Sequence, residues 1–226
     1  PTRRSSDLIN DSKFVTSSDL LAENVGYDST TVKDTLDSLL YEAINITSFT
    51  SNVEPVQEIG TNINSITLTW KLSQPATEQF INDVPVTGSS FTFDTPFNSN
   101  KSFTLKVNDG TTIKSKTIDI KFMNNIYYGV SSSTTYDSNF IESLTKELRQ
   151  ATEMNFRVNA GKDEYICFAY PSHYGEAVFS VGGFEGGFRE VAKFYYTNES
   201  GYNEQYIVYC SDNPCLGDTR VKVIYV

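Results

Sequence analysis

The pattern of apolar and polar residues divides the chain into four stretches, and the first covers residues 1–29. This stretch is rich in Ser, Asp and Asn and carries only scattered apolar residues. It can bury too little apolar surface to offset the entropy that is lost on ordering. We therefore predict an extended arm that becomes ordered only along sister chains or a host surface. The expected contact residues are Leu8, Ile9, Phe14, Val15, Leu20 and Leu21.

The second stretch, residues 30–44, has the spacing of a short amphipathic helix. Asp28 or Ser29 can cap its first turn. A helix of this length is marginal alone, because its first turn is costly to nucleate. Its apolar stripe must therefore pack on a partner, which is either the next domain or sister chains in a short parallel bundle. The stripe follows the 4-3-4 spacing of a coiled-coil seam and consists of Val32, Leu36, Leu39 and Ala43.

The third stretch, residues 45–123, alternates between apolar and polar side chains in short runs separated by turn residues. This pattern predicts an all-β sandwich. Ile66, Leu68 and Trp70 are two residues apart and so share one face of a strand. The sequence Asn108–Gly110 predicts a tight hairpin. The expected strands cover residues 46–49, 65–72, 90–93, 102–107 and 112–122.

The fourth stretch, residues 124–226, is distinguished by its aromatic content. It holds 12 of the 14 Tyr and 7 of the 15 Phe residues. Alternating runs within it predict a second β-rich domain, either α+β or a β-sandwich, that ends in a strand tied into a sheet. The expected strands cover residues 154–160, 164–171, 177–182, 188–196, 205–210 and 219–226.

One helix is expected on the flank of this second domain, over residues 139–150. Asp137 or Ser138 can cap its start. Three apolar residues recur at i, i+4 and i+8 and would form a single buried face. These residues are Phe140, Leu144 and Leu148.

The charge and hydropathy of the chain argue against nucleic acids and membranes as partners. The chain of 226 residues has a net charge of −10 and a pI of about 4.6. Nucleic-acid binding relies on Lys and Arg to neutralise phosphates, so we expect no nucleic-acid partner. We expect no membrane insertion, because no run of roughly 18 apolar residues occurs. We also expect no secretory signal, because no basic segment followed by an apolar one opens the chain.

The three cysteines, at positions 167, 210 and 215, indicate the redox setting. An odd number fits assembly in a reducing bacterial cytoplasm better than a secreted disulfide framework. Cys210 and Cys215 could pair across the turn between them. Cys167 stands between two apolar residues and is expected to be a small core side chain.

The sequence offers no strong catalytic or metal-binding motif. His173 is the only histidine and lies in a predicted turn, without a nucleophile placed to face it. Residues 182–187 lack the Lys and the Ser or Thr of a phosphate-binding loop. His173, Cys210 and Cys215 could supply three zinc ligands, but their spacing in the sequence is unlike that of a zinc site. We therefore expect no enzyme activity, no cofactor and no catalytic, cofactor-binding or metal site.

Aromatic residues near turns are the candidates for contact with a ligand. The glycine-rich stretch 182–187 predicts a surface hairpin that displays Phe184. Five tyrosines crowd another hairpin around residues 198–201, and in alternating strands about half of them must face inward. Outward tyrosines offer rigid contact surface for sugars or peptides. The candidate receptor contacts are Phe184, Tyr202 and Tyr174.

Two phrases near the start of the chain carry a family resemblance. Residues 7–16, DLINDSKFVT, resemble the LxNDxGFVT linker phrases of bacteriophage tail-fibre and virion-appendage proteins, with Lys13 in place of the usual Gly. Residues 24–40 resemble the SY(D/N)xxxTVKDALDxLL segment that often precedes the distal parts of such fibres. Together they cover about a fifth of the chain, and their structural context must support them.

Two further phrases resemble parts of such proteins. Residues 103–110, FTLKVNDG, resemble the YTLxVxDG hairpin of bacterial and phage Ig-like modules. Residues 126–130 resemble the YYGVS phrase that joins an Ig-like module to the C-terminal part of some phage structural proteins. The resemblance implies an Ig-like spacer over 45–123 and a distal tip over 124–226, and a core Trp on an early strand agrees with the Ig-like architecture.

The function implied by this resemblance is that of a head-fibre or tail-fibre subunit of a bacteriophage particle, a virion protein assembled in the host bacterial cytoplasm. The arm would contact other virion proteins through Leu8, Ile9, Phe14 and Val15. The helix would bundle chains into a homo-oligomer, with a trimer favoured, and the tip would bind a host-surface glycan or protein. The alternative is a bacterial cell-surface glycan-binding module on an Ig-like stalk. A glycan depolymerase is disfavoured, because no long repetitive β-helix pattern occurs.

Overall fold

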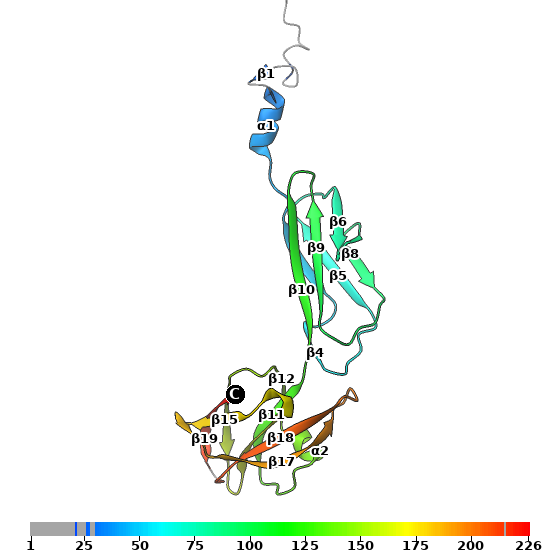
Figure 1. The fold of residues 1–226 in the computed structure, drawn as a ribbon. Coiled ribbons are helices and arrows are strands. Elements are labelled where there is room, and N and C mark those ends of the chain that lie inside the picture. The colour runs from blue at the N-terminus through cyan, green and yellow to red at the C-terminus, as the bar shows by residue number, and fades with distance from the viewer. Residues whose placement is uncertain (1–20, 22–25, 28–29, 215) are drawn as a thin grey trace, which may run out of the picture.

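The computed structural model describes residues 21, 26–27, 30–214 and 216–226. This part of the chain is mainly β and contains two α-helices, in agreement with the predicted class. Figure 1 shows a short helix, a first pair of packed sheets and a second pair following one another along the molecule. Several predictions concern residues outside the described ranges, namely Leu8, Ile9, Phe14, Val15, Leu20, Asp28, Ser29 and Cys215.

The helix α1 is shorter than predicted and covers Val32–Leu40. It follows a two-residue strand pair, β1 (Gly26–Tyr27) with β2 (Thr30–Thr31). The N-cap is Thr31, not Asp28 or Ser29: its hydroxyl accepts a hydrogen bond from the Asp34 N–H at 3.1 Å, and the Asp34 carboxylate accepts one from the Thr31 N–H at 3.2 Å. This capping box fixes where the helix begins.

The end of α1 corrects the predicted seam. The backbone is extended from Tyr41 onward, so Ala43 lies beyond the helix. Leu40 instead falls on the same face as Leu36, at i+4, and next to Leu39. Two residues after Ala43, Asn45 leads directly into the first strand of the sandwich.

The first sandwich consists of two sheets. One has the strand order β3-β5-β8, formed by β3 (Ile46–Ser51), β5 (Ile66–Leu72) and β8 (Ser90–Phe93). The other has the order β4-β10-β9-β6-β7, formed by β4 (Val56–Glu58), β10 (Ile113–Met123), β9 (Lys101–Asn108), β6 (Glu78–Ile81) and β7 (Val84–Pro85). The β4–β10 pair is parallel, whereas the other strand pairs of these sheets are antiparallel.

The core of the first sandwich matches the alternation in the sequence. Ile66, Leu68 and Trp70 are buried, as their spacing of two predicted. The Trp70 ring N–H donates a hydrogen bond to Gln79 Oε1 at 2.7 Å, which satisfies its polar atom inside the core. Ile44 also belongs to this core and is fully buried, although it lies in the range assigned to the helix.

The second pair of sheets is formed by residues 125–225. One sheet has the order β12-β11-β14-β18-β17, formed by β12 (Thr145–Leu148), β11 (Asn125–Ser131), β14 (Tyr165–Pro171), β18 (Asn203–Ser211) and β17 (Phe188–Thr197). The other has the order β13-β19-β15-β16, formed by β13 (Met154–Ala160), β19 (Gly217–Tyr225), β15 (Ala177–Val181) and β16 (Phe184–Glu185). A 3₁₀ turn, Ser172–Tyr174, follows β14.

Two separate cores cover the two faces of the five-stranded sheet. Along β14, Ile166, Phe168 and Tyr170 face the four-stranded sheet, whereas Cys167 and Ala169 face the other way. The helix α2 (Ser138–Ser143) covers this second face with two buried residues, Phe140 and Ile141. All seven residues of β14 are buried or partly buried, which explains why this strand reads as a continuous apolar run.

The predicted helix over 139–150 is wrong beyond its first turns. Asp137 caps α2 as predicted, accepting a hydrogen bond from the Phe140 N–H at 2.9 Å, but the helix ends at Ser143. The Ser143 hydroxyl donates to the Phe140 carbonyl at 2.7 Å and so competes with the helical bond. The following residues form β12 and pair with β11, which places Leu148 opposite Asn125 in a sheet.

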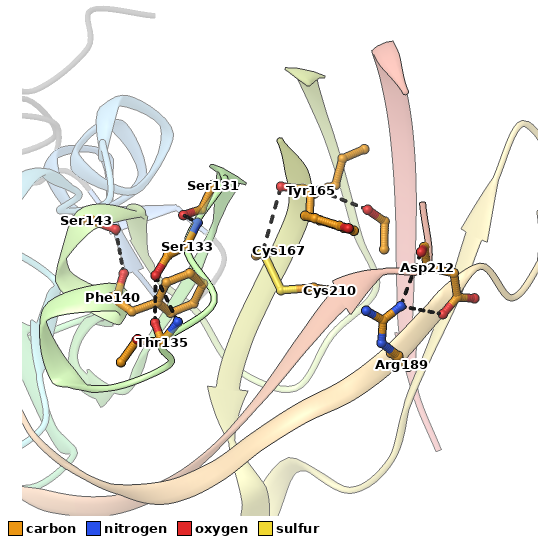
Figure 2. The surroundings of a disulfide bond; sticks show 12 residues. Ser131, Ser133, Thr135, Phe140, Ser143, Tyr165, Cys167, Arg189, Cys210 and Asp212 are labelled. Atoms are coloured by element: carbon orange, nitrogen blue, oxygen red, sulfur yellow. Dashed lines mark hydrogen bonds and ion pairs between the residues drawn. A yellow bond between two sulfur atoms is a disulfide. The ribbon is translucent and has the colours of Figure 1, made fainter. Parts of the chain in front are cut away.

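A disulfide joins the central strand of the five-stranded sheet, β14, to its neighbour β18. Cys167 of β14 and Cys210 of β18 are direct cross-strand partners with their Cα atoms 4.2 Å apart, as expected for a non-hydrogen-bonded pair. Both residues are 1% exposed, and Figure 2 shows the bond between the strands, beside the Arg189–Asp212 pair. The expected burial of Cys167 is confirmed, but Cys210 has a different partner from the one considered, Cys215.

Candidate functional site

The first candidate site is the apolar face of α1, which we call the α1 face: Val32, Leu36, Leu39 and Leu40. No residue of α1 is buried. Leu36 is 47% exposed, and Leu39 and Leu40 are each 76% exposed. The polar side of the helix carries an i,i+4 ion pair, Lys33 with Asp37, at 2.6 Å. Val32 is half-buried, whereas the three leucines of the α1 face have no cover inside the described chain.

One carboxylate attaches the end of α1 to the first sandwich. Asp109, in the β9–β10 loop, accepts hydrogen bonds at Oδ2 from the Tyr41 hydroxyl at 2.7 Å and the Ile44 N–H at 3.0 Å. Its Oδ1 accepts from the Thr111 and Thr112 N–H groups at 2.9 and 2.7 Å. The hydrogen bond from the Thr112 N–H, helped by the others, holds the pKa of Asp109 well below its usual range.

The second candidate site is the glycine-rich hairpin around β16. Phe184 is 82% exposed, as predicted. The four flanking glycines have positive φ angles of 60°, 89°, 108° and 78°, a conformation that favours glycine, so the sequence serves to turn the chain. A hollow of about 240 Å³ lies beside the ring and is lined in part by Val181 and Leu216. The hairpin therefore presents an aromatic ring on an apolar surface.

The other two predicted receptor contacts are less accessible than expected. Tyr202 is half-buried, because its Cβ lies against Gly60 of the first sandwich. Tyr174 is also half-buried and donates its hydroxyl hydrogen to the Arg149 carbonyl at 2.6 Å. Burial raises the pKa of both hydroxyls. The tyrosine that does face solvent on the 198–201 hairpin is Tyr195, at 67% exposure.

The 198–201 hairpin holds the two sandwiches together. Asn198 Nδ2 donates to the Ile59 carbonyl at 2.8 Å, and the hydroxyls of Ser200 and Thr61 are 3.0 Å apart. Gly60 makes this contact possible: with φ at +94°, a Cβ placed there would lie 2.7 Å from the Tyr202 Cβ. The hairpin expected to contact a receptor thus contacts the neighbouring sandwich.

A cleft of about 440 Å³, which we call the junction cleft, lies beside this contact. Glu58 of β4 belongs to the first sandwich. The remaining wall comes from α2, β11, β12, β17 and the hairpin that follows it. Its residues are Tyr127, Glu142, Leu144, Lys146, Tyr196 and Glu199. These positions are far apart in the sequence, and no local motif marks them.

The remaining candidate catalytic and metal-binding residues do not come together into a site. His173 is exposed, with its Nδ1 3.3 Å from Glu204 Oε1. Within the described ranges, no group of three or more His, Cys, Asp or Glu residues is placed to hold a metal ion. None of the helices there has the length and apolar character needed to cross a membrane.

Comparison with known proteins gave no match. No family model, curated protein or solved structure matches this chain.

Proposed function

We propose that this protein is a structural, non-enzymatic subunit of a bacteriophage particle, a fibre or appendage protein that displays its C-terminal domain for adhesion to a host surface. The N-terminal arm attaches the subunit to other virion proteins, through residues that include Leu8 and Phe14. The α1 face joins chains into a homotrimer. The first sandwich is an Ig-like spacer, and residues 124–226 form the distal tip.

The observation that carries this proposal is the uncovered α1 face. Leu39 and Leu40 are both mostly exposed, and burying a leucine side chain is worth about 1.5–3 kcal/mol. A nine-residue helix is too short to be stable without packing. Sister helices would cover the stripe, and the capping box at Thr31 would keep each helix formed at the point where the arm enters.

The strand order supports the Ig-like assignment of the first sandwich. Its two sheets have the β3-β5-β8 and β4-β10-β9-β6-β7 orders, and the only parallel contact in these sheets joins β4 to the last strand, β10. The buried Trp70 lies between these sheets. Two packed sheets with these strand orders are typical of Ig-like sandwiches, although Trp70 lies on β5 and not on the strand that carries the usual Ig tryptophan. A sandwich of this kind separates the helix from the tip and suits a spacer.

A measurement of solution mass tests the assembly part of the proposal. We expect the chain to have three times its mass of 25.3 kDa by light scattering after size exclusion. Replacing Leu36 and Leu39 by Lys should convert it to a monomer, because the charges would have to be buried in the seam. The control, Ser38→Lys, adds charge on the opposite side of α1 and should stay trimeric. A monomeric wild-type chain would contradict the proposal.

Immunoelectron microscopy tests the placement in a particle. Antibodies against residues 124–226 should label the outer ends of appendages on purified phage particles, and antibodies against residues 1–29 should not reach their attached bases. Particles that contain no such chain by mass spectrometry would overturn the proposal.

A further inference from the structure

Exposed apolar side chains gather where α1 meets the first sandwich. Within the described part of the chain, the exposed large apolar residues at this end are Leu36, Leu39, Leu40, Tyr41 and Ile113. Ile113 is 56% exposed and begins β10, at the tip of the β9–β10 hairpin. Figure 1 shows this tip at the end of the sandwich nearest α1. A single exposed apolar side chain is ordinary, whereas Ile113 lies beside further exposed apolar surface.

Hydrogen bonds fix the tip of this hairpin against the end of α1. The Tyr41 hydroxyl lies 2.7 Å from Asp109 Oδ2 and 2.8 Å from the hydroxyl of Thr112. Thr112 is the residue before Ile113. Gln74 Nε2 also donates to Asp109 Oδ2, at 3.1 Å. The end of the helix and the hairpin tip therefore keep a fixed relation to each other.

The length of α1 indicates that the helix alone does not complete a contact between subunits. Its nine residues span about 14 Å, whereas a stable protein interface buries about 800 Å² of each partner. A neighbouring chain that covers the leucines of the α1 face must therefore contact further surface. Ile113 offers such surface at the end of the helix, and it has no place in the core of the first sandwich.

The free edge of β10 limits this contact to the hairpin tip. β9 pairs with residues 113–120 of β10, whereas β4 pairs only with residues 121–123. The first of these ranges therefore has one edge without a strand partner in the described chain. Two exposed lysines follow Ile113 on this edge, Lys114 and Lys116. Lysines on an edge strand discourage pairing with another strand, so a neighbouring chain would contact the tip through side chains.

We propose that the tip of the β9–β10 hairpin is a second contact between subunits, in which Ile113 of each chain packs on the end of α1 of the next chain. The partner is a second copy of this chain: Tyr41 and Asp109 hold the tip and the helix together, so the chain that covers one stands beside the other. Such a contact between different surfaces closes into a ring around a three-fold axis. The inference rests on the proposed function, since it extends the homotrimer seam of the α1 face.

Light scattering after size exclusion, repeated over a dilution series of the full chain, tests this contact. Ile113→Lys should raise the concentration at which the trimer dissociates by about tenfold or more, because a charge would enter an apolar contact. Ile113→Leu keeps the contact apolar and should leave that concentration unchanged. The matched control is Val84→Lys, because Val84 is also an exposed apolar residue, at 39%, but lies on β7. This control should dissociate as the wild type does.

Cross-linking tests the geometry directly. In a Cys215→Ser background, chains with Ile113→Cys are mixed with chains that carry Leu40→Cys, and a bismaleimide is added. We expect mass spectrometry to find the peptide around residue 113 linked to the peptide around residue 40. Chains with Val84→Cys in place of Ile113→Cys should give no such link.

The outcomes separate this inference from the proposed function. A trimer that Ile113→Lys leaves intact on dilution, or a mixture without the link between residues 113 and 40, overturns the second contact and leaves the fibre proposal standing. Equal weakening of the trimer by Ile113→Lys and Val84→Lys overturns it as well. A monomeric wild-type chain overturns both proposals. Circular dichroism melts of each variant establish that a dissociated chain is still folded.

Discussion

At the scale of single residues, Asp109 shows how one side chain can organise a connection. It accepts hydrogen bonds from backbone groups of its own loop and from Tyr41 and Ile44, which precede the first strand. The sequence predicted the hairpin at this position from Asn108–Gly110 but not the long-range contacts. The signal for a turn is local, whereas the donors that arrive from residues 41 and 44 depend on how the chain enters the sandwich.

We expect Asp109→Asn to lower the melting temperature at neutral pH, because an amide accepts these hydrogen bonds more weakly than a carboxylate. The folded-state pKa of Asp109 is lowered, so its contribution to stability is present above the ordinary value of 3.8 and is lost as the pH falls below it. The difference between wild type and variant should therefore shrink in acid. Thermal melts between neutral pH and strong acid would measure it. Asp94→Asn, at an exposed position, is the control, and an unchanged wild-type melt on acidification would contradict the role given to Asp109.

At the scale of elements, the sequence predicted strands well where alternation is long and poorly where pairing is short. β13, β14 and β19 agree with their predicted ranges within two residues. Four strands have only two to four residues each, namely β4, β6, β7 and β12. Such short strands form because a neighbouring strand pairs with them. The spacing of Phe140, Leu144 and Leu148 fits a helix equally well, and the pairing with β11 decides against it.

The disulfide between β14 and β18 gives a prediction at this scale. Cys167→Ala should lower the free energy of unfolding by about 2–4 kcal/mol, because the bond constrains a loop of intermediate length in the unfolded chain. Urea denaturation of oxidised wild type and variant would measure the loss. Alkylation of the denatured, unreduced chain should modify one of the three cysteines. Three modified cysteines in the purified protein would show that the bond does not form, and the stability difference should then be small.

At the scale of the whole molecule, the two sandwiches are joined by short polar contacts and one close approach of backbone to side chain. Their cores share no residue, since the first core ends at Phe122 and the second begins at Ile126. The relation between the two therefore depends on the 198–201 hairpin, on Gly60 and on the hydrogen bond from Asn125 Nδ2 to Glu58 Oε1 at 2.6 Å. The sequence could not predict this contact or the junction cleft, because Glu58, Glu142 and Tyr196 become neighbours only through the docking of complete domains.

Gly60→Val should release this contact, since its side chain would overlap Tyr202. We expect a larger radius of gyration by small-angle X-ray scattering. Gly88→Val is the matched control: Gly88 also has a positive φ, at +81°, but no atom lies within 4 Å of an added Cβ. It should show the same backbone strain without the change in shape. Equal scattering curves for the two variants would mean that Gly60 does not control the arrangement.

The position of β19 within its sheet has a consequence for biosynthesis. β19 lies between β13 and β15, which have no direct ladder with each other, so the four-stranded sheet cannot assemble before residues 217–225 have been translated. The first sandwich has all of its strands within residues 46–123 and can fold while the ribosome is still adding the remainder. During that interval the apolar faces of β13 and β15 are uncovered. A nascent chain stalled before residue 217 would therefore carry one finished sandwich and one open sheet, which is the state that chaperones bind.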